Sequence, residues 1–140
     1  MPIHVRFALD GSGVWVMEQG ASGLLETIPF VLRRLDWDGE EVERIEGLGH
    51  TSFALLGGGR VAVLRKVVED YGCTEVLIDN VMIFEDGVDR GSVWKVTDDL
   101  DLDDWPRPAE AVQPRQDWFH VNWIAPSSRP NTVLLSLGDA

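Results

Sequence analysis

The sequence IHVRFALDGSGVWVMEQ, residues 3–19, combines a strand-like alternation, a turn and a second apolar run. From Ile3 to Leu9 apolar residues occupy every second position, which is the period of a half-buried strand. Asp10 to Gly13 supply the residue types of a turn, and the run from Val14 to Met17 is apolar on both faces. The stretch therefore predicts a β-hairpin whose second strand is the more deeply buried.

Two later segments have apolar residues at helical spacing. In the first, an interior proline is tolerated only in the opening turn, so Pro29 predicts a helix that begins near Thr27 or Ile28 and runs to Leu35. The second segment, residues 61–71, is closed by Gly72 in the manner of a helix C-terminus. Its β-branched residues would also suit a strand.

Strand-like runs make up most of the remaining chain. Residues 40–46 fit a solvated edge or short strand, and residues 51–56 and 92–97 fit strands. Residues 75–84 fit one bent strand or two strands, while 118–125 and 132–137 fit a closing hairpin. Between them, residues 98–117 form an acidic, proline-containing loop or arm that is tethered at both ends.

These elements predict an α+β fold in a single domain, residues 1–140. It consists of a mostly antiparallel sheet with about two helices packed on it and a long acidic loop before the C-terminal hairpin. A chain of 140 residues is long enough to form a core without disulfides or a structural metal.

The charge balance narrows the class of partner. The chain has 24 acidic and 12 basic residues, a formal net charge of −12. Nucleic acid and anionic membranes are disfavoured, because phosphate contacts require clustered Lys and Arg. The same charge attracts a basic protein and accelerates association with it.

The single cysteine, Cys73, indicates a reducing compartment, since it cannot form an internal disulfide. The N-terminus lacks the apolar run of a signal peptide, and no stretch approaches the ~18 apolar residues of a membrane span. We expect a soluble cytoplasmic protein of a bacterium or phage.

Acidic residues concentrate in residues 36–46 and 98–104, and each region contains or adjoins a tryptophan suited to an interface. The predicted partner-binding residues are Trp37, Asp38, Glu40, Glu41, Asp98, Asp99, Asp101, Asp103, Asp104 and Trp105. Counted from Asp99, the acids partly match a calcium-binding loop. However, Asp104 stands where that loop needs glycine, and two prolines interrupt it, so we predict no metal site.

The glycine-rich stretch Gly57, Gly58, Gly59, Arg60 lies between a predicted strand and a predicted helix. Backbone amides at such a helix start can hold an anion, with Arg60 adding charge. The stretch lacks the lysine of a P-loop and the spacing of a dinucleotide site, and a turn that needs positive φ explains it better. No other pattern predicts a nucleophile, a general base or a cofactor site.

The sequence thus favours a non-enzymatic, acidic protein-binding domain of the immunity or inhibitor type, which occludes a basic protein such as a toxin. Two alternatives stay open. One is a structural subunit of a phage or secretion assembly that uses residues 98–117 to reach a neighbour. The other is a small phosphate-binding enzyme built around Gly57 to Arg60. The sequence does not indicate a family or an oligomeric state.

Overall fold

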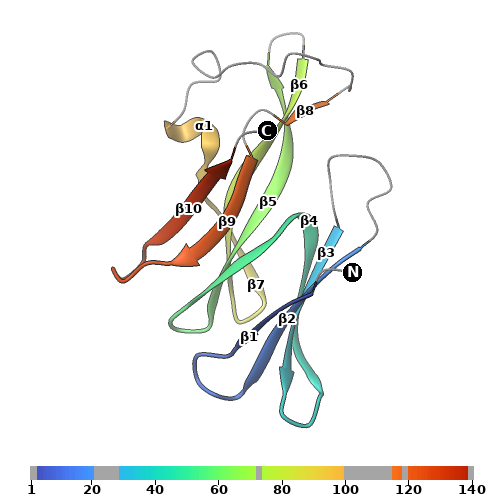
Figure 1. Ribbon diagram of the computed structural model, residues 1–140, viewed down its shortest axis with the longest axis vertical. Helices are drawn as coiled ribbons and strands as arrows, with labels where there is room; N and C mark the ends of the chain where they lie inside the picture. The colour runs from blue at the N-terminus through green and yellow to red at the C-terminus, as the bar shows by residue number, and fades with distance from the viewer. Residues whose placement is uncertain (1–2, 21–28, 72–73, 100–114, 118–119, 139–140) are drawn as a thin grey trace.

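A computed structural model describes residues 3–20, 29–71, 74–99, 115–117 and 120–138 of the chain. These residues form strands and one short helix (Figure 1). The elements are β1 (Ile3–Phe7), β2 (Gly13–Gln19), β3 (Pro29–Asp36), β4 (Glu41–Leu56), β5 (Arg60–Tyr71), β6 (Thr74–Glu85), β7 (Val88–Lys95), α1 (Val96–Asp99), β8 (Arg115–Asp117), β9 (His120–Pro126) and β10 (Val133–Gly138).

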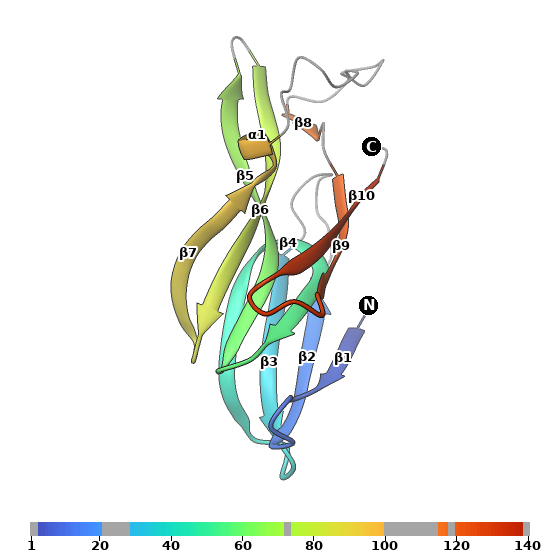
Figure 2. The same cartoon turned by 90° about the vertical axis from the view of Figure 1, so that its left-hand side faces the viewer.

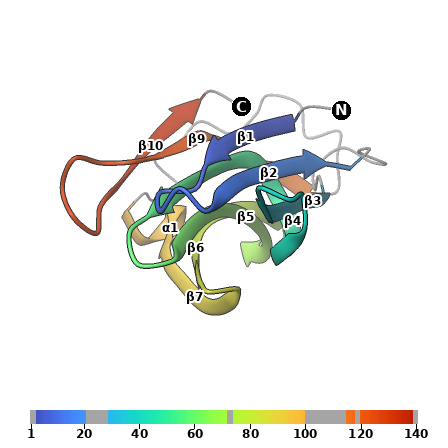
Figure 3. The ribbon, with the colours of Figure 1, turned by 90° about the horizontal axis from the view of Figure 1, so that it is seen from below.

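Strands β1 to β7 form one sheet in sequence order, each antiparallel to the next, and β8 pairs with β6 in parallel. The long strand β4 joins the two halves of this sheet, because its first part pairs with β3 and its second part with β5. The sheet curls strongly, as the view from below shows (Figure 3). Strands β2 and β3 thereby share one core with β5 and β6.

The hairpin of β9 and β10 is a second, two-stranded sheet that packs on the other face of β4 to β6 (Figure 2). A second core lies between them, and it contains Ala54, Leu64, Val81, Val121 and Ile124. The central strands therefore bury side chains on both faces.

The prediction of an α+β fold with about two helices is wrong, because the described chain is nearly all antiparallel sheet. The first expected helix falls on β3, where Phe30 and Leu32 are buried with the period of a strand. Pro29 is the first residue of that strand, a position that tolerates a missing amide. The beginning of the expected helix, up to residue 28, lies outside the described residues.

The second expected helix is β5. Val61 and Val63 enter the core that β5 shares with β2 and β3, whereas Ala62 and Leu64 enter the core under β9. Because both faces of β5 are buried, its apolar and polar residues do not alternate, and the apolar run is continuous. A continuous apolar run also contains apolar residues at helical spacing, so the sequence fits a helix as well.

Both predicted hairpins are confirmed, and β2 is more deeply buried than β1. Residues 75–84 lie within a single strand, β6, which turns into β7 at Asp86 and Gly87 with φ of 49° and 78°. Trp123 lies within β9 and is 45% exposed. A bulge in the pairing of β9 with β10 shifts the alternation there, so that Val121 and Ile124 both face inward.

Buried polar contacts fix the C-terminal hairpin on the sheet. The Asp79 carboxylate accepts a hydrogen bond from the Val121 amide at 2.8 Å. The Ser52 hydroxyl accepts from the Ile124 amide at 3.0 Å and donates to its carbonyl at 3.3 Å. The Lys66 ammonium lies 3.5 Å from Asp79, and both side chains are buried. Within the described ranges, no helix has the length and apolar character needed to cross a membrane.

The buried ion pair gives a stability prediction. Lys66→Met should lower the free energy of unfolding by about 3–5 kcal/mol, because it leaves the buried Asp79 carboxylate without its cation. Urea denaturation followed by tryptophan fluorescence measures the change. Lys95→Met removes a partly exposed pair with Glu69 and should change stability little. Equal losses for the two variants would contradict the assigned role of Lys66.

Candidate functional site

Four turns lie toward one end of the molecule, which we call the turn end: residues 8–12, 37–40, 57–59 and 86–87 (Figure 1). Contacts tie the first two together, since the Trp37 indole Nε1 donates to the Gly11 carbonyl at 2.8 Å. Residues of the first, third and fourth turns line one hollow. The turn end therefore combines segments that are far apart in the sequence.

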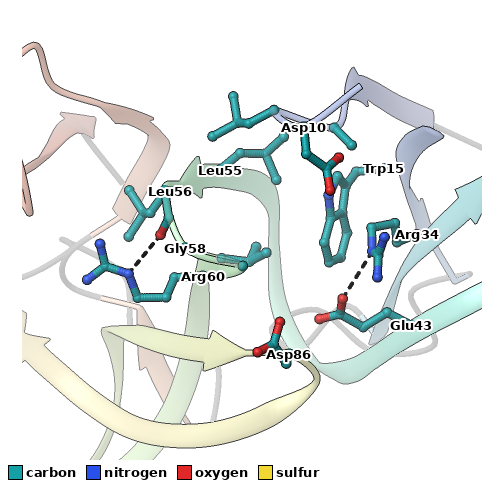
Figure 4. Close-up of a pocket in the computed structure, with 14 residues that line it drawn as sticks. Asp10, Trp15, Arg34, Glu43, Leu55, Leu56, Gly58, Arg60 and Asp86 are labelled. Carbon is teal, nitrogen blue, oxygen red and sulfur yellow. Dashed lines mark hydrogen bonds and ion pairs between the residues drawn. The ribbon is translucent and has the colours of Figure 1, made fainter. Parts of the chain in front are cut away.

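The hollow has a volume of about 160 Å³ (Figure 4). The Trp15 ring and Leu55 are part of its wall, and the carboxylates of Asp10, Glu43 and Asp86 line it. Arg34 lines it as well, with its guanidinium 6.0 Å from the centre of the Trp15 ring. The hollow is thus partly apolar and bordered by charges of both signs.

Glu43 is the most constrained of these carboxylates. Its side chain is only 8% exposed, and it faces Arg34 directly across the β3–β4 ladder. Arg34 Nε donates to Oε2 at 3.2 Å, while Oε1 is buried and has no hydrogen-bond partner among the described residues. A buried acceptor left without a partner costs free energy, so Oε1 has a capacity to accept a hydrogen bond that the described residues do not use.

Asp10 is held ionised by its own turn. The Ser12 hydroxyl and amide donate to its Oδ1 at 2.6 and 2.9 Å. These bonds, with a smaller contribution from Arg34, hold the pKa of Asp10 below its ordinary value of 3.8. Asp10 therefore carries a negative charge at neutral pH.

Gly57 to Arg60 form the tight turn between β4 and β5, with φ of 73° at Gly58 and 72° at Gly59. The helix on which the anion-site hypothesis depended is the strand β5, so no helix N-terminus supplies amides here. Arg60 donates to the Gly57 carbonyl and to Asn131 Oδ1, each at 2.9 Å. Its guanidinium points away from Asp86 and the hollow (Figure 4).

Beside the hollow lie three exposed apolar side chains, Phe7, Leu9 and Trp37, which we call the aromatic patch. They are 74%, 68% and 64% exposed, and the Phe7 and Trp37 rings are 6.3 Å apart. An apolar groove extends from the patch along β1 to Pro126, past Val5. Exposed apolar residues that cluster in this way mark interaction surfaces.

The alternation of apolar residues in β1 does not predict this patch. The pattern placed Phe7 in the core, but the register sets Arg6 opposite the buried Trp15. Arg6 therefore lies on the same face of the sheet as Trp15, and although it stays exposed, its guanidinium is 5.7 Å from the centre of the Phe53 ring. Phe7 is left on the outer face.

Among the predicted partner-binding residues, Trp37, Asp38 and Glu40 lie in one turn at the turn end and are exposed. The carboxylate of Asp36 fixes this turn, because its Oδ1 accepts from the amides of Asp38 and Glu40, both at 2.9 Å. Glu41 begins β4 and forms an ion pair with Arg44 at 3.1 Å.

The second predicted acidic segment lies elsewhere. Asp98 and Asp99 belong to α1, which is far from the turn end in both side views (Figures 1 and 2). Asp98 accepts from the Lys95 amide at 2.8 Å, and Asp99 accepts from the Trp94 indole at 2.7 Å. The other predicted residues of this segment lie outside the described ranges, namely Asp101, Asp103, Asp104 and Trp105.

Within the part of the chain that the structure covers, no group of three or more His, Cys, Asp or Glu residues is arranged to hold a metal ion. The calcium-like spacing from Asp99 falls mostly on residues that the structure does not describe. No family model matches the chain, and no curated protein or solved structure matches it.

The Ser12–Asp10 contact predicts a titration result. Ser12→Ala should raise the pKa of Asp10 toward 3.8, because it removes the hydroxyl bond that stabilises the carboxylate. A carboxyl-detected NMR titration measures this pKa. Since the pKa of Asp10 is lower in the folded state, its contact with Ser12 should stabilise the folded protein at pH values above the unfolded-state pKa. This contribution should be lost as the pH falls through the folded-state pKa. An unchanged Asp10 titration in Ser12→Ala would contradict the contact.

The glycine turn offers a matched pair of variants. Gly59→Ala should lower stability by about 1–2 kcal/mol, because φ is +72° there and the new Cβ would approach the Asp86 carboxylate. Gly57→Ala serves as the control, since it meets no atom within 4 Å and has no positive φ. Thermal unfolding of both variants measures the difference, and equal midpoints would be inconsistent with the described turn.

Proposed function

We propose that the protein is a non-enzymatic binding domain that docks a basic protein at its turn end. The main support is the exposed aromatic patch of Phe7, Leu9 and Trp37, which lies beside exposed carboxylates. The ring contact of Phe7 with Trp37 and the hydrogen bond from Trp37 to Gly11 hold the patch in place. An apolar centre within a charged border is the arrangement expected of a protein–protein interface.

The charges at this end favour a basic partner. Asp10, Asp38 and Glu40 are exposed next to the patch, and the pKa of Asp10 is depressed. Their field adds to a net charge of −12 for the whole chain. Such a field attracts a basic protein over roughly a Debye length of 8–10 Å and accelerates the encounter.

Trp37 has the features of an interface hot spot. Its ring is exposed, yet its Nε1–H bond to Gly11 and its contact with Phe7 hold it in place. A side chain that is already ordered loses little conformational freedom on binding, so its buried area contributes more fully to affinity.

The same charges argue against the other functions considered. A second copy docked through the same patch would bring two acidic borders together, which disfavours a self-assembling subunit. A phosphate in the hollow would face the carboxylates of Asp10, Glu43 and Asp86. An inhibitor that occludes a basic protein in the cytoplasm, where a lone cysteine stays reduced, fits both the charge and the single Cys73.

The test uses the partner that co-purifies with the tagged full chain from its native cells. We expect a basic protein, and Trp37→Ser should weaken its binding about thirtyfold or more, because it removes the patch centre. Trp123→Ser is the matched control, since Trp123 is an exposed tryptophan on β9 that belongs neither to the patch nor to the lining of the apolar groove. Surface plasmon resonance at two salt concentrations gives the affinities and the association rates.

The association rate should fall as salt rises, because screening weakens the attraction between the partners. An acidic partner, a rate independent of salt, or equal losses for Trp37→Ser and Trp123→Ser would each contradict the proposal.

A further inference from the structure

The hollow beside the aromatic patch has a chemistry of its own. We propose that it receives one basic side chain of the partner, an alkylammonium or alkylguanidinium group, and that Glu43 is the principal group that binds it. The source of the side chain rests on the proposed function, whereas the cation site itself can be tested without any partner.

The charge inside the hollow favours a cation. Three carboxylates line it, from Asp10, Glu43 and Asp86. Of the two arginines that line it, Arg60 directs its guanidinium to Gly57 and Asn131, away from Asp86 (Figure 4). Arg34 remains, and it is bonded to Glu43 Oε2 and to the Ser12 hydroxyl. The interior thus has an excess of negative charge.

Glu43 has an unused hydrogen-bond acceptor in the wall of the hollow. Its side chain is more than nine-tenths buried, and it keeps one oxygen, Oε1, without a hydrogen-bond partner in the described chain. The Arg34 contact uses only Oε2. An N–H donor that carries positive charge would satisfy Oε1, and a charge-assisted bond of this kind is about twice as strong as a neutral one.

The size of the hollow fits an alkyl cation. Its volume of about 160 Å³ is similar to that of a cavity of about 150 Å³ that accommodates benzene. Trp15 and Leu55 provide apolar surface for the methylene stem, and an aromatic ring also attracts a cation. A bare metal ion fits less well, since the described carboxylates do not form a metal-binding group.

The hollow is also within reach of a docked partner. Leu9 belongs to the aromatic patch and lines the hollow as well, and Asp10 follows it in the same turn. A partner that covers Phe7 and Trp37 therefore borders the opening of the hollow. One lysine or arginine side chain of that partner can enter it.

The experiment titrates the full-length protein with n-butylammonium or n-propylguanidinium chloride while NMR follows the amide shifts. Binding should be saturable, with a dissociation constant in the millimolar range for so small a ligand. The shifts should centre on Trp15, Glu43, the 57–59 turn and Asp86. Sodium chloride at equal ionic strength and n-butanol serve as the controls for salt and for the apolar stem.

Glu43→Gln keeps an acceptor for Arg34 and removes the charge, and it should weaken binding of both cations about fivefold to tenfold. Asp86→Asn is a second variant in case Glu43→Gln perturbs the fold, and it should weaken binding in the same direction. Glu46→Gln is the control, since its carboxylate is exposed and pairs with Arg44. No saturable shift up to about 50 mM, or equal affinities in Glu43→Gln, Asp86→Asn and Glu46→Gln, overturns the cation site.

The binding of the partner to Trp37→Ser and to Glu43→Gln tests the docking surface and the cation site separately. If Trp37→Ser weakens partner binding and Glu43→Gln does not, the docking proposal stands and the insertion of a basic side chain is overturned. If the small cations bind the hollow but Trp37→Ser leaves partner binding unchanged, the cation site stands and the docking proposal fails.

Discussion

Burial of both faces of strands β4 to β6 is the constraint on which the rest of the structure depends. Phe53, Val63 and Met82 face the core enclosed by the curled sheet, and their neighbours Ala54, Leu64 and Val81 face the C-terminal hairpin. Both faces of these strands are apolar and must be kept from water. The curl of the sheet covers one face, and β9 covers the other. Strand β4 passes from its pairing with β3 to its pairing with β5 within this curl. The four turns of the turn end then lie toward the same end of the molecule.

The same constraint explains which parts of the fold the sequence predicts. The hairpins of β1 with β2 and of β9 with β10 bury mainly one face, and their period or turn residues reveal them in the sequence. Strand β5 is buried on both faces, so its run of aliphatic residues is continuous and fits a helix as well as a strand. The bulge that turns Trp123 outward depends on pairing with β10, which no local pattern encodes.

The sequence likewise predicts only some residues of the candidate site. Trp37, Asp38 and Glu40 are contiguous, and their composition alone marked them as a possible contact surface. Phe7 lies on the outer face because the register pairs Arg6, and not Phe7, with the buried Trp15. Glu43 meets Arg34 through the register of two strands, and Asp86 reaches the hollow through a separate hairpin. Such juxtapositions follow from tertiary pairing, so spacing in the sequence does not reveal them.

We propose that the turn end is the docking surface for a basic protein. Hydrogen–deuterium exchange of the full chain, with and without its co-purified partner, tests this most directly because it maps the footprint without any substitution. If the partner docks there, exchange should become slower at residues 8–12 and 37–40 on binding and should change little in α1 and β7. Protection confined to α1, β7 or β10, with the turn end unaffected, would contradict it.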